Sequence, residues 1–154
     1  MSRHSAGVLQ QGSTVVTLPT GTTALTPEEH ANRLLLISTA AAAYTLNLPR
    51  AYGTGDTYEF LLTVAHSSGS IIINAPAGVP SNVFVGSIFQ HHSSGNILIR
   101  NGSTANDIIT LNNTTTGGLA AGDYIELVDA APNTWRVVFG LVTTNGAQAT
   151  PFSG

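Results

Sequence analysis

Several short segments of this chain hold residue types that can carry chemistry. Gly53-Thr54-Gly55 lies between two apolar runs, where a phosphate-binding loop would lie. A dinucleotide motif needs a third glycine and a helix after it, whereas Thr57-Tyr58-Glu59-Phe60 reads as a strand. The glycines permit the positive φ angles of a tight reversal, so we interpret this segment as a structural turn.

Histidine and cysteine chemistry finds little support in the sequence. His91-His92 is the most metal-like pair, but adjacent residues of a strand point to opposite faces and no third ligand follows at a standard spacing. His66, Asp56 and one of many serines could form a catalytic triad on paper, yet no Gly-x-Ser-x-Gly elbow is present. The chain has no cysteine, which excludes disulfides and thiolate sites.

Two segments with carboxylate or other oxygen-bearing side chains have structural explanations. The oxygen-rich stretch from Asn101 to Asp107 looks like a calcium loop, but it lacks the alternate carboxylates of an EF-hand and favours a hairpin connection. Glu28-Glu29 follows Thr26-Pro27, a pattern typical of a capped helix start, so it does not indicate a glycosidase pair. We therefore predict a protein that is not an enzyme and has no catalytic residue, cofactor or metal.

Composition limits the partners that the protein can bind. Charged residues make up 8% of the 154 residues, lysine is absent, and the five arginines are scattered, which argues against nucleic acid. No window approaches 18 uninterrupted apolar residues and the polar N-terminus shows no signal peptide, so no membrane contact is expected. A surface wetted by Ser, Thr, Asn and Gly loses few ions from water when another protein covers it. This favours extensive subunit contact.

The elements that position these residues are predicted to be strands. Ten short runs rich in β-branched and aromatic residues are separated by Gly, Asn, Ser, Asp and Pro. They are Thr14 to Leu18, Arg33 to Ser38, Tyr44 to Leu48, Thr57 to Val64, Ser70 to Asn74, Val83 to Phe89, Asn96 to Asn101, Asp107 to Asn112, Asp123 to Asp129 and Thr134 to Val142. The fold class predicted is all-β, an antiparallel β-sandwich or barrel-like sheet with one short N-terminal helix near Pro27.

The chain is predicted to hold one β domain, residues 26–142, between an extended N-terminal arm, residues 1–25, and a polar C-terminal tail, residues 143–154. No period of 20 to 50 residues recurs, which argues against a solenoid. Alternate strand positions are expected to form the core. These are Tyr44, Leu46, Leu48, Phe60, Leu62, Ile97, Ile99, Ile125, Leu127, Trp135 and Val137.

Two segments resemble a known class of proteins. A strand ending in Leu48-Pro49, the Gly53-Thr54-Gly55 turn and a following polar-aromatic strand are similar to a segment of tailed-bacteriophage virion structural proteins. Gly122-Asp123-Tyr124, with the strand after it and Trp135-Arg136-Val137, resembles the closing hairpin of such proteins. The resemblance spans about two thirds of the chain and is closest to small head decoration (cement) proteins.

That resemblance implies a protein on the outer surface of the phage head, made in the host cytoplasm, that stabilises the shell by bridging capsid subunits. The implied partners are the major capsid protein and further copies of the chain in a homotrimer. The apolar residues of the arm are the expected partner contacts: Val8, Leu9, Val15, Val16 and Leu18. The alternative is a tail fibre, spike or carbohydrate-binding receptor module, for which Tyr52 is the best exposed aromatic candidate.

Overall fold

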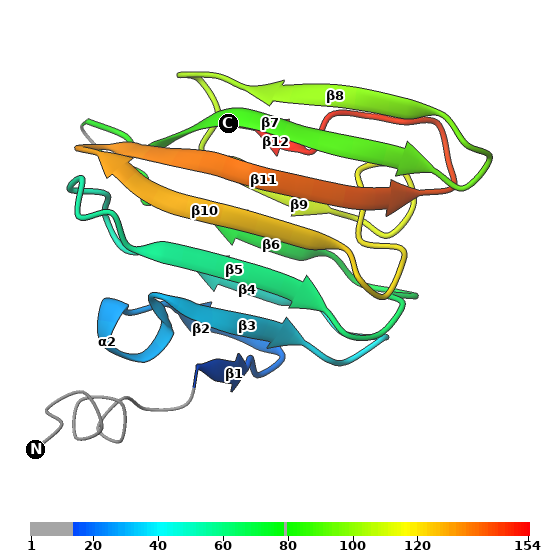
Figure 1. Cartoon of the computed structure of the whole chain (residues 1–154), viewed down its shortest axis with the longest axis horizontal. Coiled ribbons are helices and arrows are strands. Elements are labelled where there is room, and N and C mark those ends of the chain that lie inside the picture. The colour runs from blue at the N-terminus through cyan, green and yellow to red at the C-terminus, as the bar shows by residue number, and fades with distance from the viewer. Residues whose placement is uncertain (1–13, 79) are drawn as a thin grey trace, which may run out of the picture.

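In this computed structural model, residues 14–78 and 80–154 are described, and they form two β-sheets that pack face to face with one short helix at their side (Figure 1). The larger sheet has seven strands in the order β1-β3-β5-β10-β11-β7-β8, and the smaller has five in the order β12-β9-β6-β4-β2. The elements are β1 (Val15–Thr17), β2 (Gly21–Ala24), α2 (Pro27–His30), β3 (Arg33–Ile37), β4 (Tyr44–Asn47), β5 (Thr57–Leu62), β6 (Ile71–Asn74), β7 (Val83–His92), β8 (Ile97–Gly102), β9 (Ile108–Leu111), β10 (Tyr124–Ala131), β11 (Thr134–Thr144) and β12 (Phe152–Ser153).

The predicted all-β class is confirmed, and of the two forms expected, a sandwich or a barrel-like sheet, the strands form two packed sheets. The antiparallel pairing is wrong for half of the strand pairs. β1, β3 and β5 run parallel in one sheet, β2, β4 and β6 run parallel in the other, and β7 runs parallel to β11. The remaining five pairs are antiparallel. A strand with one buried face alternates in the same way in either pairing, so the apolar pattern alone does not fix the direction.

The first six strands form a short solenoid of parallel strands, although the lack of a sequence repeat argues against one. Each strand of the larger sheet is followed by one of the smaller sheet, so the chain returns to the first sheet in the same direction. Val15 of β1 pairs with Leu34 of β3, and Leu34 pairs with Glu59 of β5. The two windings, counted in residues from one paired position to the next, therefore differ in length. Because the windings are unequal, no fixed period appears in the sequence.

The helix is confirmed at the expected position. Pro27 occupies the first turn, and the Thr26 hydroxyl accepts a hydrogen bond from the Glu29 N–H at 3.4 Å. The return bond comes from an unexpected partner, because the Thr26 N–H donates to His30 Nδ1 at 3.0 Å and not to a glutamate. Ala31 is already extended and ends the helix, so β3 follows within two residues.

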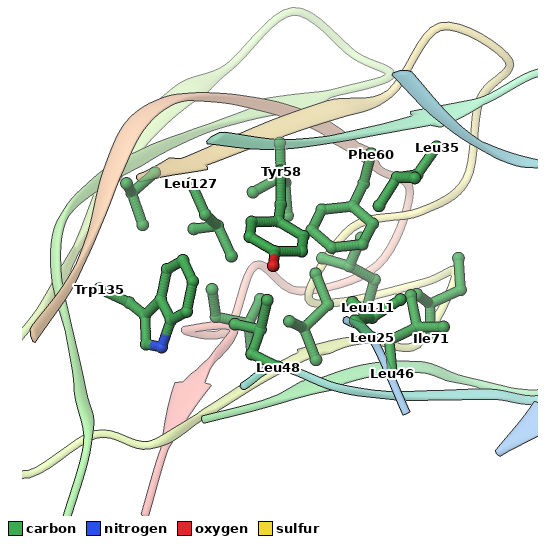
Figure 2. Packing of buried hydrophobic residues seen from close by; sticks show 14 of the residues in the cluster. Leu25, Leu35, Leu46, Leu48, Tyr58, Phe60, Ile71, Leu111, Leu127 and Trp135 are labelled. Carbon is green, nitrogen blue, oxygen red and sulfur yellow. The ribbon is translucent and has the colours of Figure 1, made fainter. Parts of the chain in front are cut away.

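The core lies between the two sheets (Figure 2). Nine of the eleven predicted core residues are buried, and Tyr44, Leu46 and Leu127 are fully so. Ile97 and Ile99 are the errors, with exposures of 61% and 58%. They lie on β8, the last strand of the larger sheet, and pair with the outward-facing His91 and Phe89, so the second sheet does not cover them.

Both terminal segments are more structured than expected where the structure describes them. Residues 14–25, assigned to the arm, form β1 and β2 at one edge of each sheet. Residues 143–154, assigned to a tail, end β11, cross a loop and close the smaller sheet as β12. Phe152 is buried in the core, and the Gln148 amide donates to the Gln90 carbonyl at 2.9 Å, which holds the loop on β7.

Candidate functional site: the outer face of the larger sheet

The expected partner residues of the arm do not form a separate surface. Val8 and Leu9 lie outside the described residues. Val15 and Val16 belong to β1, which pairs in parallel with β3, and Val16 packs against the core. Leu18 is buried at 2% exposure, and its N–H donates to the Leu36 carbonyl at 2.9 Å. Leu18 is thus a core residue of its own domain and is not accessible to a partner.

The Gly-Thr-Gly segment is a turn held by one carboxylate. Asp129 of β10 accepts hydrogen bonds from the N–H of Tyr52 (3.0 Å) and of Gly53 (2.6 Å) and from the Thr54 hydroxyl (2.9 Å). Gly53 and Gly55 both have φ of 82°, as the turn interpretation requires. Burial alone would raise the pKa of Asp129, but these donors outweigh it and hold the pKa below its ordinary value.

The residues considered for triad and metal chemistry are kept apart or used structurally. Asp56 precedes β5 and His66 follows it, so a whole strand separates them. Asp56 accepts from Asn32 Nδ2 at 3.0 Å, and it shares the single proton of the Thr54 hydroxyl, 3.0 Å away, with Asp129, which braces the turn. His66 is buried at 1% exposure beside the Tyr44 ring, with a centroid distance of 6.4 Å.

His91 and His92 end β7, and His92 Nδ1 bonds to the Ser94 hydroxyl at 2.7 Å. Over residues 14–78 and 80–154, no group of three His, Asp or Glu side chains is placed to hold a metal ion.

The stretch from Asn101 to Asp107 forms the end of β8 and a local turn, and it leads from the larger sheet to β9 of the smaller sheet, so the expected hairpin connection is wrong. Asn106 Oδ1 accepts from the N–H of Ser103 at 3.0 Å and from its hydroxyl at 2.9 Å, so the loop oxygens bond to one another. Beside it, a groove of about 440 Å³ is lined by Asn47, Asn74 and Asp107 together with the loop after β6. The Asn74 amide bonds to Asn47 Oδ1 at 2.9 Å across β4 and β6.

The outer face of the larger sheet carries the strongest candidate for a functional surface. Five large apolar side chains there are between 38% and 61% exposed, and we call them the apolar face. They are Phe89 of β7, Ile97 and Ile99 of β8, and Phe139 and Leu141 of β11. Together they leave roughly 500 Å² of accessible surface, at the upper end of what a monomer exposes in one patch.

Strand register brings these side chains together. Phe89 lies opposite Ile99 on one side and opposite Leu141 on the other. The Phe139 ring is tilted against Phe89, with centroids 6.4 Å apart, and against Tyr124 of β10, at 6.1 Å. A groove of about 390 Å³, lined in part by His91, Ile97 and Leu141, runs along one end of the apolar face. The surface is therefore both continuous and hollowed.

Acidic side chains mark the inner border of the apolar face. Glu126 and Glu59 lie opposite each other on β10 and β5, and the Tyr124 hydroxyl is 3.4 Å from Glu126 Oε2. Burial, and then the charges of Glu59 and Glu126, raise the pKa of Tyr124, so this phenol stays protonated at neutral pH. The border combines hydrogen-bonding capacity with negative charge, as the rim of a protein interface does.

Sequence reasoning did not find the apolar face. Only Trp135 and Val137 of β11 were named as core residues, and no exposed apolar surface was predicted for Phe139 and Leu141. The signal present in the sequence was the lack of alternation in Val137-Val138-Phe139 and in Ile97-Leu98-Ile99. In a two-layer sandwich, each strand has one side toward the core and one side toward solvent. The apolar residues of such a run that point to the solvent side therefore form an exposed surface.

Within residues 14–78 and 80–154, no helix is long and apolar enough to cross a membrane. Comparison with known proteins found no matching protein-family model, no matching curated protein and no matching solved structure.

Proposed function

We propose that this protein is a structural component of a tailed-bacteriophage virion, a decoration protein that binds the outer head surface and bridges capsid subunits. The resemblance of the segments around Leu48-Pro49 and Gly122-Asp123 supports the class of protein. The observation that carries the mode of action is the apolar face, because it offers a continuous contact for another protein on a chain with few charged residues.

The proposed contact differs from the arm expected from the sequence. Phe139 and Leu141 form the part of the docking surface next to its polar border, which consists of Tyr124, Glu59 and Glu126. Aromatic and aliphatic side chains at the centre of an interface supply most of the binding free energy, while a polar rim excludes water. Many copies on one shell stabilise it through multivalency even when each contact is modest.

Threonine substitutions on β11 test this function. We expect the wild-type protein to co-sediment with expanded empty heads of the phage that encodes it. The double variant Phe139→Thr and Leu141→Thr keeps β-forming residues at exposed positions, so the domain should stay folded. Losing two large apolar contacts should weaken binding at least tenfold, since about 1.4 kcal/mol corresponds to that factor.

The matched control is Tyr52→Ser, because Tyr52 is the most exposed aromatic side chain described, at 68%, and lies outside the apolar face. This control should bind heads as the wild type does. Failure of the folded wild-type protein to bind heads, or antibody labelling of tails in place of heads by electron microscopy, would contradict the decoration function.

A receptor-binding function is the second candidate, and Tyr52 is the observation that favours it. Its ring stands exposed on the turn held by Asp129, beside a cavity of about 90 Å³ that Arg50 and Asp56 also line. An exposed aromatic ring next to charged hydrogen-bonding groups is a suitable stacking site for a sugar. The position is rigid because three hydrogen bonds to Asp129 fix the turn.

For this candidate, we expect glycan-array binding by the wild-type protein that Tyr52→Ser abolishes and the Phe139→Thr, Leu141→Thr double variant retains. The two functions thus predict opposite effects of the same variants. An array without any bound glycan would eliminate the carbohydrate function for the sugars tested.

A further inference from the structure

β8 ends the larger sheet, and its outer edge has no strand partner among residues 14–78 and 80–154. In Figure 1 it forms the border of the molecule opposite β1. Exposed edges of this kind are usually protected by charges, proline or a bulge, because they recruit other strands. β8 has none of these on its apolar stretch, Ile97-Leu98-Ile99, which reads as three large exposed side chains in succession.

Hydrogen bonding within the β7–β8 hairpin determines which backbone groups face the open edge. The His92 N–H donates to the Asn96 carbonyl at 2.7 Å, and the register places Gln90 opposite Leu98. In an antiparallel ladder, every second residue bonds to the neighbouring strand. Asn96, Leu98 and Arg100 therefore face β7, and the N–H and C=O groups of Ile97 and Ile99 face outward.

This edge is complementary to itself. Ile97-Leu98-Ile99 is the same sequence in both directions, so a two-fold axis at Leu98 places Ile97 opposite Ile99 of a second copy. The outward N–H and C=O groups of these two residues then meet as a hydrogen-bonded pair, and the two Leu98 residues meet as a non-hydrogen-bonded pair. Both the backbone polarity and the side chains match in this single register.

Side chains at the edge leave room for such a partner. Arg100, the charged residue of β8, is turned inward: its Nε donates to Gln90 Oε1 at 2.9 Å and its Nη2 to the Gln148 carbonyl at 2.6 Å. No two like charges would meet across the new pair. Leu98 lies opposite the buried Gln90 on the core side of the sheet, yet it is 40% exposed.

From this edge we infer that two copies of the chain associate through antiparallel pairing of β8 with β8, which joins the two larger sheets into one. The inference goes beyond the proposed function and does not depend on it. The three apolar side chains supply roughly 300 Å² per copy, less than the ~800 Å² per partner of a standard interface. The dimer is therefore weak and concentration-dependent, and its two-fold symmetry differs from the homotrimer implied by the resemblance.

Cysteine cross-linking tests this register directly, because the native chain has no cysteine. Under mild oxidation, Leu98→Cys should form a disulfide-linked dimer, since non-hydrogen-bonded pairs have Cα atoms about 4.5 Å apart, within disulfide range. Ile97→Cys mixed with Ile99→Cys should also cross-link. Neither Ile97→Cys nor Ile99→Cys should cross-link when it is the only variant present. The same residue on two copies is then a diagonal pair, whose Cα atoms lie more than about 7 Å apart.

A second measurement follows the association without a cross-link. Analytical ultracentrifugation of the wild-type chain should show a monomer that converts to twice its mass as concentration rises. Ile99→Pro removes an outward N–H and leaves the ladder to β7 intact, so it should abolish this conversion while circular dichroism stays unchanged. If Ile99→Pro does not fold, Leu98→Asp serves in its place, because it sets two like charges opposite each other.

A wild-type chain that remains monomeric at millimolar concentration would overturn the inference. So would an oligomer whose mass is unaffected by the folded edge variant, or one in which Ile97→Cys cross-links to itself as efficiently as to Ile99→Cys. A trimer mass would assign the contact to another surface. None of these outcomes bears on head binding, which is measured separately with the β11 variants.

Discussion

Replacing Leu127 by alanine is expected to lower the free energy of unfolding by about 2–5 kcal/mol, because the side chain is removed from a core that cannot fully collapse around the cavity. Leu127 is fully buried on β10, a central strand of the larger sheet, and lies opposite Tyr58 and Val137. Denaturant unfolding followed by circular dichroism measures the change, with an unaltered slope expected if both states keep their compactness.

The matched control is Val138→Ala on the neighbouring β11. Val138 is 50% exposed, so the same kind of truncation there should change stability by no more than about 0.5 kcal/mol. Equal losses for the two variants would mean that the side of the sheet facing the core has been assigned wrongly. The comparison also separates burial from strand propensity, because both substitutions place alanine within a strand.

The strands themselves were largely predictable from local patterns. The run from Tyr44 to Leu48 alternates and is flanked by a turn, and its apolar residues are buried as expected. The capped helix at Pro27 was equally clear, because its signals lie within four residues of one another. β2 and β12 were missed because Gly21–Ala24 and Phe152–Ser153 are short and carry little apolar sequence of their own.

Long-range arrangement was not encoded in any local pattern. Parallel pairing of β1, β3 and β5 depends on connections that lead through the other sheet, and their unequal lengths hide the repeat. Ile97 and Ile99 were assigned to the core as alternate positions of an apolar strand, but they lie on the outer side of the sheet with His91 and Phe89, which the apolar run alone does not reveal. The candidate site was missed for the same reason.

Two buried carboxylates are expected to respond in opposite ways to substitution by asparagine. Asp129 uses both oxygens, Oδ1 for the Gly53 N–H and Oδ2 for Tyr52 and Thr54, so asparagine must lose one acceptor and turn an amide toward a donor. We expect Asp129→Asn to cost about 1–3 kcal/mol at neutral pH. Asp123 accepts from the N–H of Gly118 and of Thr143 through Oδ2, and an asparagine oxygen can take over these two bonds; the Thr143 side chain and the Ala120 N–H also stabilise its carboxylate.

The pH dependence of stability distinguishes the two sites as well. The pKa of Asp129 is held low, so its ionised form stabilises the fold above the pKa of the unfolded chain, and this contribution is lost as pH falls below about 4. Burial raises the pKa of Asp123 despite its hydrogen bonds, so its contribution is present at low pH and is lost as pH rises through the folded-state pKa.

Asp123→Asn should therefore leave stability at neutral pH unchanged or raised, whereas Asp129→Asn should lower it and flatten the loss of stability in acid. Denaturant midpoints for both variants, measured at closely spaced values between about pH 3 and pH 7, check the two expectations together. The neutral amide at Asp123 removes the cost of burying a charge and keeps the bonds that tie the Gly118 turn to β11. A larger loss for Asp123→Asn than for Asp129→Asn at neutral pH would show that the Asp123 charge stabilises the fold.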